Sequence, residues 1–507
     1  MPSPTFAQWA AAVSQRSNRS LAGSRLFPGA AKGFATSNTK GEPFNNSLQS
    51  TSETASHEAL QAYAWGMTLA QTQEDADFDM SAPLEDITDA PNLTGEEAIG
   101  YAAEHMPVLT TLMQRFRREM DFSGIRIATC LILEPKTAVL LRELAAAGAV
   151  VGVFCEPDAT DQRIADELKR EGIAVEANAS WNDEEAHQGA LRLLDVLQPD
   201  IIIDDGGNLA RLAIMERPDI ASKLIGVAEE TTSGIRAFQA MEDEQALPFP
   251  VIAVNNSAMK TGFDNAHGTG ETCVTTIQRL LGPQTFDGSR VVVVGYGPVG
   301  EGFAKRIRSI GASVTICDSN PVAALRAVFD GFAAQDLDQC LPHADMIVSA
   351  TGVRHTITVN HMRHMREGAV LAVIGGIANE LALDELPSFD YHEGAVSTIH
   401  IPHGPNLVLL SQGDGVNYTA GGGNPIEIMD FSFAVQASAV AYLLRTRGHL
   451  EARLHRLPET CDRNIASVAL ELRGYSASQA ATDNGYHWKL TRFADSREER
   501  GKTHTSQ

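Results

Sequence analysis

The chain has 507 residues, 43% of them hydrophobic, and a formal net charge of −24. That length is enough for two or three domains with their own cores. The negative charge argues against nucleic acid as the main partner. No apolar run approaches the roughly 20 residues that a membrane helix needs, so we expect no membrane partner. The six cysteines lack the spacing of a metal site, and they predict buried thiols in a reducing, cytoplasmic compartment with no bound metal.

Residues 1–93 are predicted to form an N-terminal extension that is partly disordered. The first 41 residues contain five Lys or Arg, six Ser and no acidic residue. This composition favours a disordered tail, and a mitochondrial targeting segment is the alternative. A helical stretch at 57–71 and an acidic connector at 73–90 follow.

The folded part of the chain is predicted to begin at Thr94, which forms a capping-box pattern with Glu97 before a helix. From there, apolar strand candidates alternate with amphipathic helices. These strands are predicted at 125–133, 150–157, 200–207, 289–297, 313–318, 345–352 and 368–376. The alternation predicts an α/β fold with two doubly wound, parallel, Rossmann-like sheets and a helical C-terminal segment.

The order of these segments predicts how the domains are arranged. We place a first α/β domain at 94–257 and a second at 258–424. Residues 425–507 are predicted to return to the first domain and to end in a polar C-terminal segment.

A glycine-rich turn opens the second series of strands. Gly295, Gly297 and Gly300 form a GxGxxG pattern between an apolar strand and a helix that begins at Pro298 and Val299. Such glycines allow a tight turn and close approach of a pyrophosphate to the helix N-terminus.

The residue that follows the next strand helps to identify the dinucleotide. Asp318 can accept both ribose hydroxyls and would repel a 2′-phosphate, and no Arg follows it directly. The pattern predicts NAD as cofactor and an NAD-binding domain at 258–424. The alternative is a glycine-rich turn that binds no ligand.

Polar side chains cluster at three places upstream of this turn. Asp204 and Asp205 end an apolar strand, and the segment 227–234 places two acids and three hydroxyls after another apolar segment. Lys260, Asp264 and Asn265 follow. Each cluster alone is typical of helix caps or a solvated surface, but together they predict a polar pocket at the carboxyl edge of a sheet.

Several of these segments resemble, in order and spacing, those of the S-adenosylhomocysteine hydrolase family. Asp205 and Glu230 are 25 residues apart, and Glu230 and Lys260 are 30 apart, as in that family. The resemblance covers about 94–475. It rests on CLILEPKTAVLLREL, DDGGNL, EETTSGIRAF, VNNSAMKTGFDN, VVVGYGPVGEGFAKRIRSIGASV and GVNYTAGGGNP.

The resemblance implies a substrate-binding domain at 94–257 and a reaction cycle on tightly bound NAD. A nucleoside 3′-hydroxyl is oxidised, the 4′-hydrogen is removed, the 5′ substituent leaves, water adds, and the ketone is reduced again. By resemblance Lys260 and Asp264 engage the 3′-hydroxyl, Asp205 is the base at the 4′-position, and Glu230 binds a sugar hydroxyl. To accept a proton near neutrality Lys260 needs a lowered pKa, which we expect burial to provide.

The resemblance also implies a set of NAD contacts. Asn265 matches a residue beside the nicotinamide, and Thr351 and Gly352 end a strand of the NAD-binding domain. The full set of expected cofactor residues is Thr231, Thr232, Ser233, Asn265, Gly295, Gly297, Pro298, Val299, Gly300, Asp318, Thr351, Gly352 and Asn417.

The departures from the family pattern fall on the substrate half of the expected site. Ile132 and Glu134 stand where the family has His and Thr, and Thr269 stands where it has Cys. Gly376 and Asn424 stand where the family has two further His. The altered positions are Ile132, Glu134, Thr269, Gly376 and Asn424. The C-terminal Lys and Tyr that reach a neighbouring subunit in the family have no clear match.

These departures favour an adenosylhomocysteinase-like enzyme on a different 5′-substituted nucleoside, stopping at elimination or adding water. The alternatives are true S-adenosylhomocysteine hydrolysis, a non-catalytic NAD-binding regulator of the same family, and a simple dehydrogenase. The family's habit also leads us to expect a homo-oligomer, dimer or tetramer.

Overall fold

The structure is a computed structural model, and it describes residues 93–376, 379–387, 389 and 394–478. The chain divides into two compact units, Met1–Glu85 and Asp86–Gln507. All described residues belong to the second unit. The helix expected at 57–71 lies outside the described residues, and so does the acidic connector expected at 73–90.

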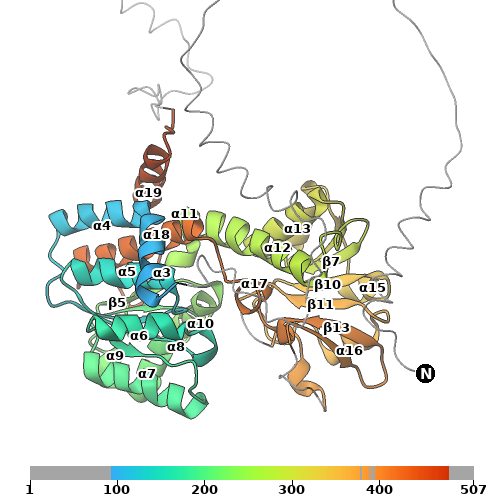
Figure 1. The fold of residues 1–507 in the computed structure, drawn as a ribbon, viewed down its shortest axis with the longest axis horizontal. Helices are drawn as coiled ribbons and strands as arrows, with labels where there is room; N and C mark the ends of the chain where they lie inside the picture. The colour runs from blue at the N-terminus through green and yellow to red at the C-terminus, as the bar shows by residue number, and fades with distance from the viewer. Residues whose placement is uncertain (1–92, 377–378, 388, 390–393, 479–507) are drawn as a thin grey trace, which may run out of the picture. The chain divides into compact units, whose positions relative to one another are not determined.

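The first sheet has seven parallel strands in the order β14-β6-β5-β4-β1-β2-β3 (Figure 1). They are β1 Arg126–Cys130, β2 Val150–Phe154, β3 Ala174–Glu176, β4 Ile201–Asp204, β5 Gly226–Glu229, β6 Val251–Ala253 and β14 Leu454–His455. The sheet therefore takes its edge strand β14 from the far end of the chain, about 200 residues after its neighbour β6.

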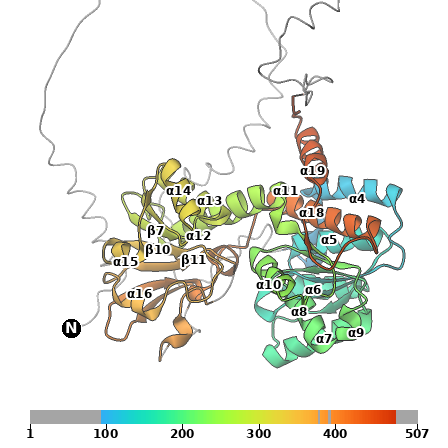
Figure 2. The ribbon, with the colours of Figure 1, turned by 180° about the vertical axis from the view of Figure 1, so that it is seen from behind.

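Side chains of each central strand alternate between two apolar cores, one on each face of this sheet. Ile201 and Ile203 of β4 belong to one core, and Ile202 between them belongs to the other. The first core is covered by α3 Gly95–Glu104, α4 Pro107–Glu119, α5 Pro135–Ala146, α6 Gln162–Arg170, α18 Ile426–Arg445 and α19 Glu459–Leu472. The second is covered by α7 Asp183–Leu197, α8 Asn208–Glu216, α9 Pro218–Ala221 and α10 Thr232–Asp243, which Figure 2 shows from behind.

The second sheet also has seven strands, in the order β12-β13-β11-β10-β7-β8-β9. They are β7 Arg290–Val294, β8 Ser313–Cys317, β9 Ala333–Ala334, β10 Met346–Ser349, β11 Val370–Val373, β12 Val396–His400 and β13 Asn406–Leu410. All pairs are parallel except β12 with β13. Its helices include α12 Gly270–Leu281, α13 Pro298–Ser309, α14 Pro321–Phe329, α15 Leu337–Cys340, α16 Val359–Arg363 and α17 Val416–Thr419.

The α/β class with two doubly wound sheets is confirmed, and so is the helical C-terminal segment. The capping box at Thr94 is present as well, because the Thr94 backbone N–H donates to Glu97 Oε2 at 2.9 Å. Seven strands were not predicted, and each has at most four residues or lies at or next to a sheet edge: β3, β5, β6, β9, β12, β13 and β14. The predicted domain boundaries stay a prediction.

The expectation that no apolar run comes near membrane length is wrong for α18. This helix is long and apolar enough to cross a membrane by length and composition, and it is the one such helix in the described part of the chain. However, 83% of its apolar window is buried inside the protein. It packs against α4, α5, α19 and the segment 261–269, so it is apolar on nearly all sides because protein surrounds it.

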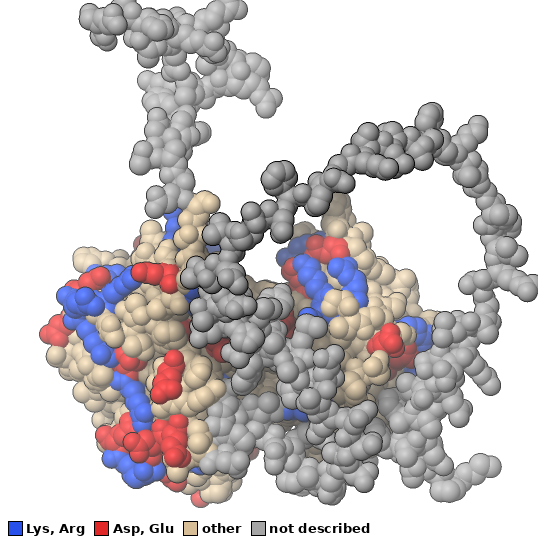
Figure 3. Space-filling view, turned by 45° about the horizontal axis from the view of Figure 1, so that its top comes forward, with Lys and Arg blue, Asp and Glu red and all other residues tan. Residues whose placement is uncertain are grey.

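Figure 3 shows the charged side chains on one face of the described residues. There, acidic and basic side chains lie next to one another on the described residues. Ion pairs such as Arg142–Glu171 and Arg192–Glu176 are examples of this mixing within the fold.

Candidate active site

A π-helix carries the central polar residues of the site. It is η4 Thr261–Thr269, which lies between α11 Ala258–Lys260 and α12. A π-helix has a wider turn than an α-helix and is frequent at functional sites. It places the Lys260 Nζ 3.0 Å from Asp264 Oδ1 and 2.9 Å from Asn265 Oδ1.

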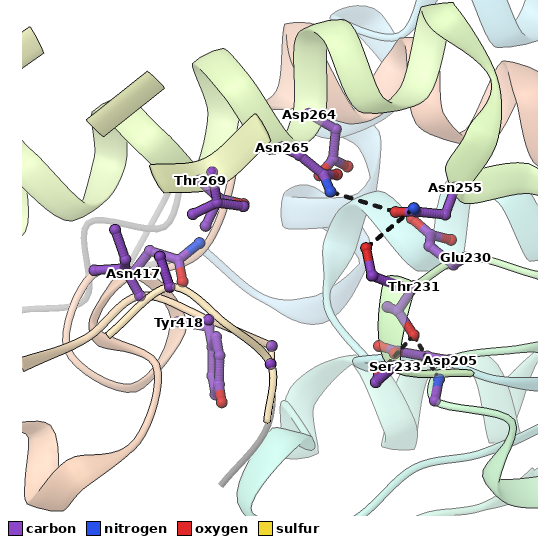
Figure 4. Close-up of a pocket in the computed structure, with 18 of the residues that line it drawn as sticks. Asp205, Glu230, Thr231, Ser233, Asn255, Asp264, Asn265, Thr269, Asn417 and Tyr418 are labelled. Atoms are coloured by element: carbon purple, nitrogen blue, oxygen red, sulfur yellow. Dashed lines mark hydrogen bonds between the residues drawn. The ribbon is translucent and has the colours of Figure 1, made fainter. Parts of the chain in front are cut away.

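These three side chains are almost fully buried, with Lys260 5%, Asp264 4% and Asn265 9% exposed. Buried polar groups need partners, and here each has them. The second Asp264 oxygen, Oδ2, accepts from Ser432 Oγ of α18 at 2.7 Å. Asn265 Nδ2 donates to Asn255 Oδ1 at 3.3 Å, and Figure 4 shows this bond.

In both acid pairs, Asp204–Asp205 and Glu229–Glu230, the first acid accepts from backbone N–H groups and the second lines the pocket. In the pair at the end of β4, Asp204 is fully buried and accepts from the backbone N–H groups of Leu209 and Ala210 in α8, whereas Asp205 lines the pocket. In the pair at the end of β5, Glu229 is fully buried and Glu230 lines the pocket. The first acid of each pair therefore supports the backbone, and the second faces the ligand space.

Glu229 holds two of these loops together. Its carboxylate accepts from the backbone N–H groups of Gly206 at 3.0 Å, Gly207 at 2.9 Å and Thr231 at 2.9 Å. The Thr231 hydroxyl also donates to Glu229, at 2.8 Å. This places the turn after Asp205 beside the start of α10. Burial raises the pKa of Glu229, and the carboxylates of Asp204 and Asp205 raise it further.

Two acids that line the pocket, Glu230 and Asp205, have raised pKa values because they are buried. Burial raises the pKa of Glu230 to about 7, although the Lys260 ammonium acts in the opposite direction. Burial also raises the pKa of Asp205, and Lys260 again opposes it. Glu230 Oε2 accepts from Gln436 Nε2 of α18 at 2.8 Å, and the Gln436 Oε1 is buried without a hydrogen-bond partner.

The expected lowering of the Lys260 pKa is wrong for this arrangement. Burial does favour the neutral amine, but the carboxylates of Asp264 and Glu230 favour the ammonium more, and the pKa of Lys260 is raised. A prediction from burial alone gives a lowered pKa for Lys260, because such a prediction omits the carboxylates that surround the amine.

The glycine-rich turn has the shape of a dinucleotide cradle. Gly295 has φ +99°, and a Cβ on Gly300 would lie 2.0 Å from the Gly295 carbonyl oxygen, so α13 packs directly on the strand end. A Cβ on Gly297 would meet nothing within 4 Å, which leaves open space above the N-terminus of α13. No side chain caps that N-terminus, so its N–H groups can bind a phosphate. The residues present therefore fit NAD.

Asp318 follows β8 on the same edge, as expected for the ribose-binding acid. Its Oδ2 accepts from the Tyr296 backbone N–H at 2.7 Å, and its Oδ1 accepts from the Asn320 backbone N–H at 2.8 Å. These bonds hold the carboxylate beside the glycine turn.

A buried glutamate that the sequence analysis missed holds the loop after β10. Glu380 is 0% exposed and accepts from the backbone N–H groups of Thr351 and Gly352, each at 3.0 Å. The carbonyl oxygens of the same two residues accept from Arg236 Nη1 of α10, at 3.0 and 3.2 Å. Thr351 and Gly352 are thus held from both sides, as a cofactor contact requires.

All the expected cofactor and catalytic residues except Gly300 line one pocket of about 1830 Å³. The five altered positions line it as well: Ile132, Glu134, Thr269, Gly376 and Asn424. Ile132 is 39% exposed there, and Glu134 forms an ion pair with Lys136 at 2.7 Å. Thr269 Oγ1 donates to Asn424 Oδ1 at 3.3 Å. Figure 4 shows Asn417 and Tyr418 on the opposite side of the drawn residues from Asp205 and Glu230.

Four polar side chains that complete the site were not predicted from the sequence: Asn255, Ser432, Gln436 and Glu380. Ser432 and Gln436 are four residues apart, which puts them on one face of α18. Two polar residues at this spacing in a mostly apolar helix are the signal that could have found them.

Two family models match the chain. The one described as S-adenosyl-L-homocysteine hydrolase matches residues 83–219, and the one described as S-adenosyl-L-homocysteine hydrolase, NAD binding domain, matches residues 265–423. The second match includes the glycine-rich turn and Asp318.

The chain is also similar to curated proteins over most of its length. It is 37% identical to the S-inosyl-L-homocysteine hydrolase of Methanopyrus kandleri over 78% of this chain and 94% of that protein. It is 38% identical to the adenosylhomocysteinase of Archaeoglobus fulgidus over 76% of this chain and 96% of that protein. A second S-inosyl-L-homocysteine hydrolase, from Methanocaldococcus jannaschii, is 37% identical over 75% of this chain and 92% of that protein. The chain therefore belongs to the adenosylhomocysteinase family and is an NAD-dependent hydrolase with a nucleoside-type substrate.

Proposed function

We propose that the protein oxidises the 3′-hydroxyl of a 5′-substituted nucleoside other than S-adenosylhomocysteine and then eliminates the 5′ substituent. The observation that carries this proposal is the Lys260 amine, held by Asp264 and Asn265 in the same pocket as Asp205, Glu230 and the dinucleotide cradle.

Lys260 and Asp264 form the pair that would receive the hydroxyl proton. The ammonium form of Lys260 can hydrogen-bond the hydroxyl oxygen, and the neutral form can take its proton. Oxidised NAD, when bound, supplies the hydride acceptor and a positive ring charge that favours the neutral amine of Lys260. Asn265 keeps the amine aimed, because its side-chain oxygen accepts from the same Nζ.

Asp205 is the group proposed to remove the 4′-hydrogen once the ketone has acidified it. Its raised pKa makes it a stronger base than an exposed aspartate. Glu230, with a pKa of about 7, can exchange a proton with a sugar hydroxyl near neutrality.

The substrate is proposed to differ from S-adenosylhomocysteine because the altered positions line the pocket. Ile132 and Glu134 present an apolar side chain and a carboxylate where the family resemblance indicates His and Thr. Two relatives of this chain are named as hydrolases of S-inosyl-L-homocysteine, so the purine base is one feature that could differ.

Hydrolysis of S-adenosylhomocysteine itself is the second candidate. It is favoured by the retention of Asp205, Glu230, Lys260 and Asp264 in one pocket and by relatives that carry the name adenosylhomocysteinase.

One experiment separates the candidates. The purified protein is assayed for bound NAD and then mixed with S-adenosylhomocysteine, S-inosylhomocysteine, adenosine and inosine. Formation of bound NADH with a nucleoside, together with slow release of homocysteine from S-adenosylhomocysteine, is the expected result. Fast release of homocysteine from S-adenosylhomocysteine selects the second candidate. Bound NAD that no nucleoside reduces supports a regulator, and release of free NADH supports a simple dehydrogenase.

We also propose that the protein forms a homo-oligomer. Val322, Leu325 and Phe329 are 73%, 58% and 85% exposed, and their spacing puts them on one face of α14. An apolar face of this kind is typical of an interface. Light scattering should give a smaller particle for Phe329→Asp than for the wild type, and no change for Val196→Asp at an isolated exposed position of α7. An unchanged particle for Phe329→Asp excludes α14 from the interface.

A further inference from the structure

Asn424, one of the five altered positions, is hydrogen-bonded both to Asp264 of the oxidation residues and to the altered residue Thr269. It follows α17 and precedes α18, and its amide makes three side-chain hydrogen bonds. Its Nδ2 donates to Asp264 Oδ1 at 3.1 Å. Its Oδ1 accepts from Asn417 Nδ2 at 3.1 Å and from Thr269 Oγ1 at 3.3 Å.

These bonds leave one orientation for the amide. The Oδ1 atom must face the two donors, and the Nδ2 atom must face the Asp264 carboxylate, because the reverse orientation would place two acceptors together. Gly268 leaves room for this arrangement, since a Cβ there would come within 2.8 Å of Asn424 Cγ.

The Asp264 carboxylate is consequently held at both oxygens. Oδ1 accepts from Asn424 and from Lys260, and Oδ2 accepts from Ser432. An error of about 1 Å in placing a catalytic group can cost about 10²-fold in rate. The hydrogen-bond donors that hold the Asp264 carboxylate therefore affect how precisely the Lys260 amine is positioned.

We propose that Asn424 is a positioning residue for the oxidation step, because its amide fixes the Asp264 carboxylate against Lys260. The family resemblance indicates His at position 424 and Cys at 269. In this chain, a neutral amide and a hydroxyl replace that titratable pair and bond to each other. The inference rests on the proposed role of Lys260 and Asp264 in 3′-oxidation.

The charged groups around the carboxylate are few. Lys260, Glu230 and Asp205 interact with it electrostatically. Asp430 of α18 faces α4, where it accepts from the backbone N–H groups of Val108 and Leu109. A charge introduced at Asn424 would therefore act mainly on Asp264 and Lys260.

The test compares Asn424→Asp, Asn424→Leu and the wild type. The readout is bound NADH formed on mixing each holoenzyme with adenosine or inosine across a range of pH. We expect Asn424→Leu to be slower by about 10²-fold at every pH. We expect Asn424→Asp to be as slow at neutral pH, because two carboxylates then face each other. The rate of Asn424→Asp should recover as the pH falls, since a protonated carboxyl offers the same donor and acceptor as the amide.

The matched control is Asn182→Asp, which adds the same charge at the exposed N-cap of α7, where aspartate caps as well as asparagine. A purely structural role predicts no recovery at low pH. An Asn424→Asp profile that is parallel to the wild-type profile would overturn the inference.

A second readout does not depend on activity. Acetylation of Lys260 by acetic anhydride, followed by mass spectrometry at several pH values, reports the pKa of its amine. We expect this pKa to be higher in Asn424→Asp than in the wild type and in Asn182→Asp, and equal values would overturn the inference. If the wild type reduces bound NAD with neither nucleoside, the proposed function is wrong, and Lys260 acetylation alone then tests the position of Asn424.

Discussion

The oxidation residues and the altered substrate residues share one pocket but differ in how completely the protein surrounds them. Lys260 and Asp264 are 5% and 4% exposed and are hydrogen-bonded to each other and to their neighbours. By contrast, the altered residue Ile132 is 39% exposed, and Tyr418, which also lines the pocket, is 42% exposed. The oxidation residues are preorganised, whereas the substrate side leaves side-chain surface to be covered by a ligand.

This difference in burial predicts where substitutions are tolerated. A change among the buried residues removes a partner from another buried polar group, which costs stability and geometry together. A change at an exposed pocket position alters only what the ligand meets. A new substrate is therefore more readily accommodated through Ile132 or Tyr418 than through Lys260.

The largest effect is expected from Lys260→Ala. Removing the proton acceptor should slow the formation of bound NADH by about 10²–10⁴-fold. Bound NAD should remain, because the hydrogen bonds of the Lys260 amine go to Asp264 and Asn265 and not to the cradle at Gly295–Gly300. Stopped-flow fluorescence measures the rate of NADH formation, and the NAD content after denaturation measures how much cofactor is bound. Lys223→Ala, which removes an exposed lysine, is the control. Loss of NAD from the Lys260 variant would mean that the lysine is structural.

Asp205→Asn separates the two chemical steps. The 3′-oxidation should persist, since Lys260 and Asp264 are untouched, but removal of the 4′-hydrogen should slow by about 10²-fold. Bound NADH should therefore accumulate, and release of the 5′ group should nearly stop. Chromatography of the products measures that release. If oxidation is lost along with elimination, Asp205 acts on the first step instead.

Glu230→Gln tests whether the raised pKa of this buried carboxyl changes how the free energy of unfolding depends on pH. The folded pKa of Glu230 is about 7, above its usual 4.5, so between these pH values the folded state holds a proton that the unfolded state has lost. Its contribution to the free energy of unfolding is complete below pH 4.5 and falls as the pH rises towards 7, by roughly 1.4 kcal/mol per pH unit. The variant should show a flatter dependence in urea titrations between these pH values. Glu244→Gln at an exposed position should keep the wild-type slope, and a Glu230 variant with that slope would contradict the raised pKa.

The smallest effect is expected on the exposed side. Ile132→His changes a side chain that is 39% exposed, so the fold and bound NAD should be unaffected. We expect a shift of about tenfold in the relative kcat/KM for S-adenosylhomocysteine and S-inosylhomocysteine, as for a single change in a pocket wall. Steady-state kinetics with both substrates measure it. A loss of oxidation as large as that of Lys260→Ala would remove the distinction between the two sides.

Local patterns made most of the fold predictable. The GxGxxG turn, its flanking strand and helix, Asp318 and the Thr94 capping box depend on residues that are close in sequence, and each has its expected form. Alternation and helix periodicity are local properties, and they also predicted a set of the strands: β1, β2, β4, β7, β8, β10 and β11. Short edge strands such as β14 were missed, since their pairing partner is distant in sequence.

By itself, the sequence determined the α/β class, the NAD cradle and the family resemblance, because these follow from short segments and their order. Only the tertiary structure showed that the first acid of each pair, Asp204 and Glu229, accepts hydrogen bonds from backbone N–H groups. It also brought Ser432 to Asp264 across 168 residues and Gln436 to Glu230 across 206. The sign of the Lys260 pKa shift depends on the summed charges of carboxylates from three separate segments. Electrostatic energy depends on distance in space, and distance in space is what a linear sequence does not contain.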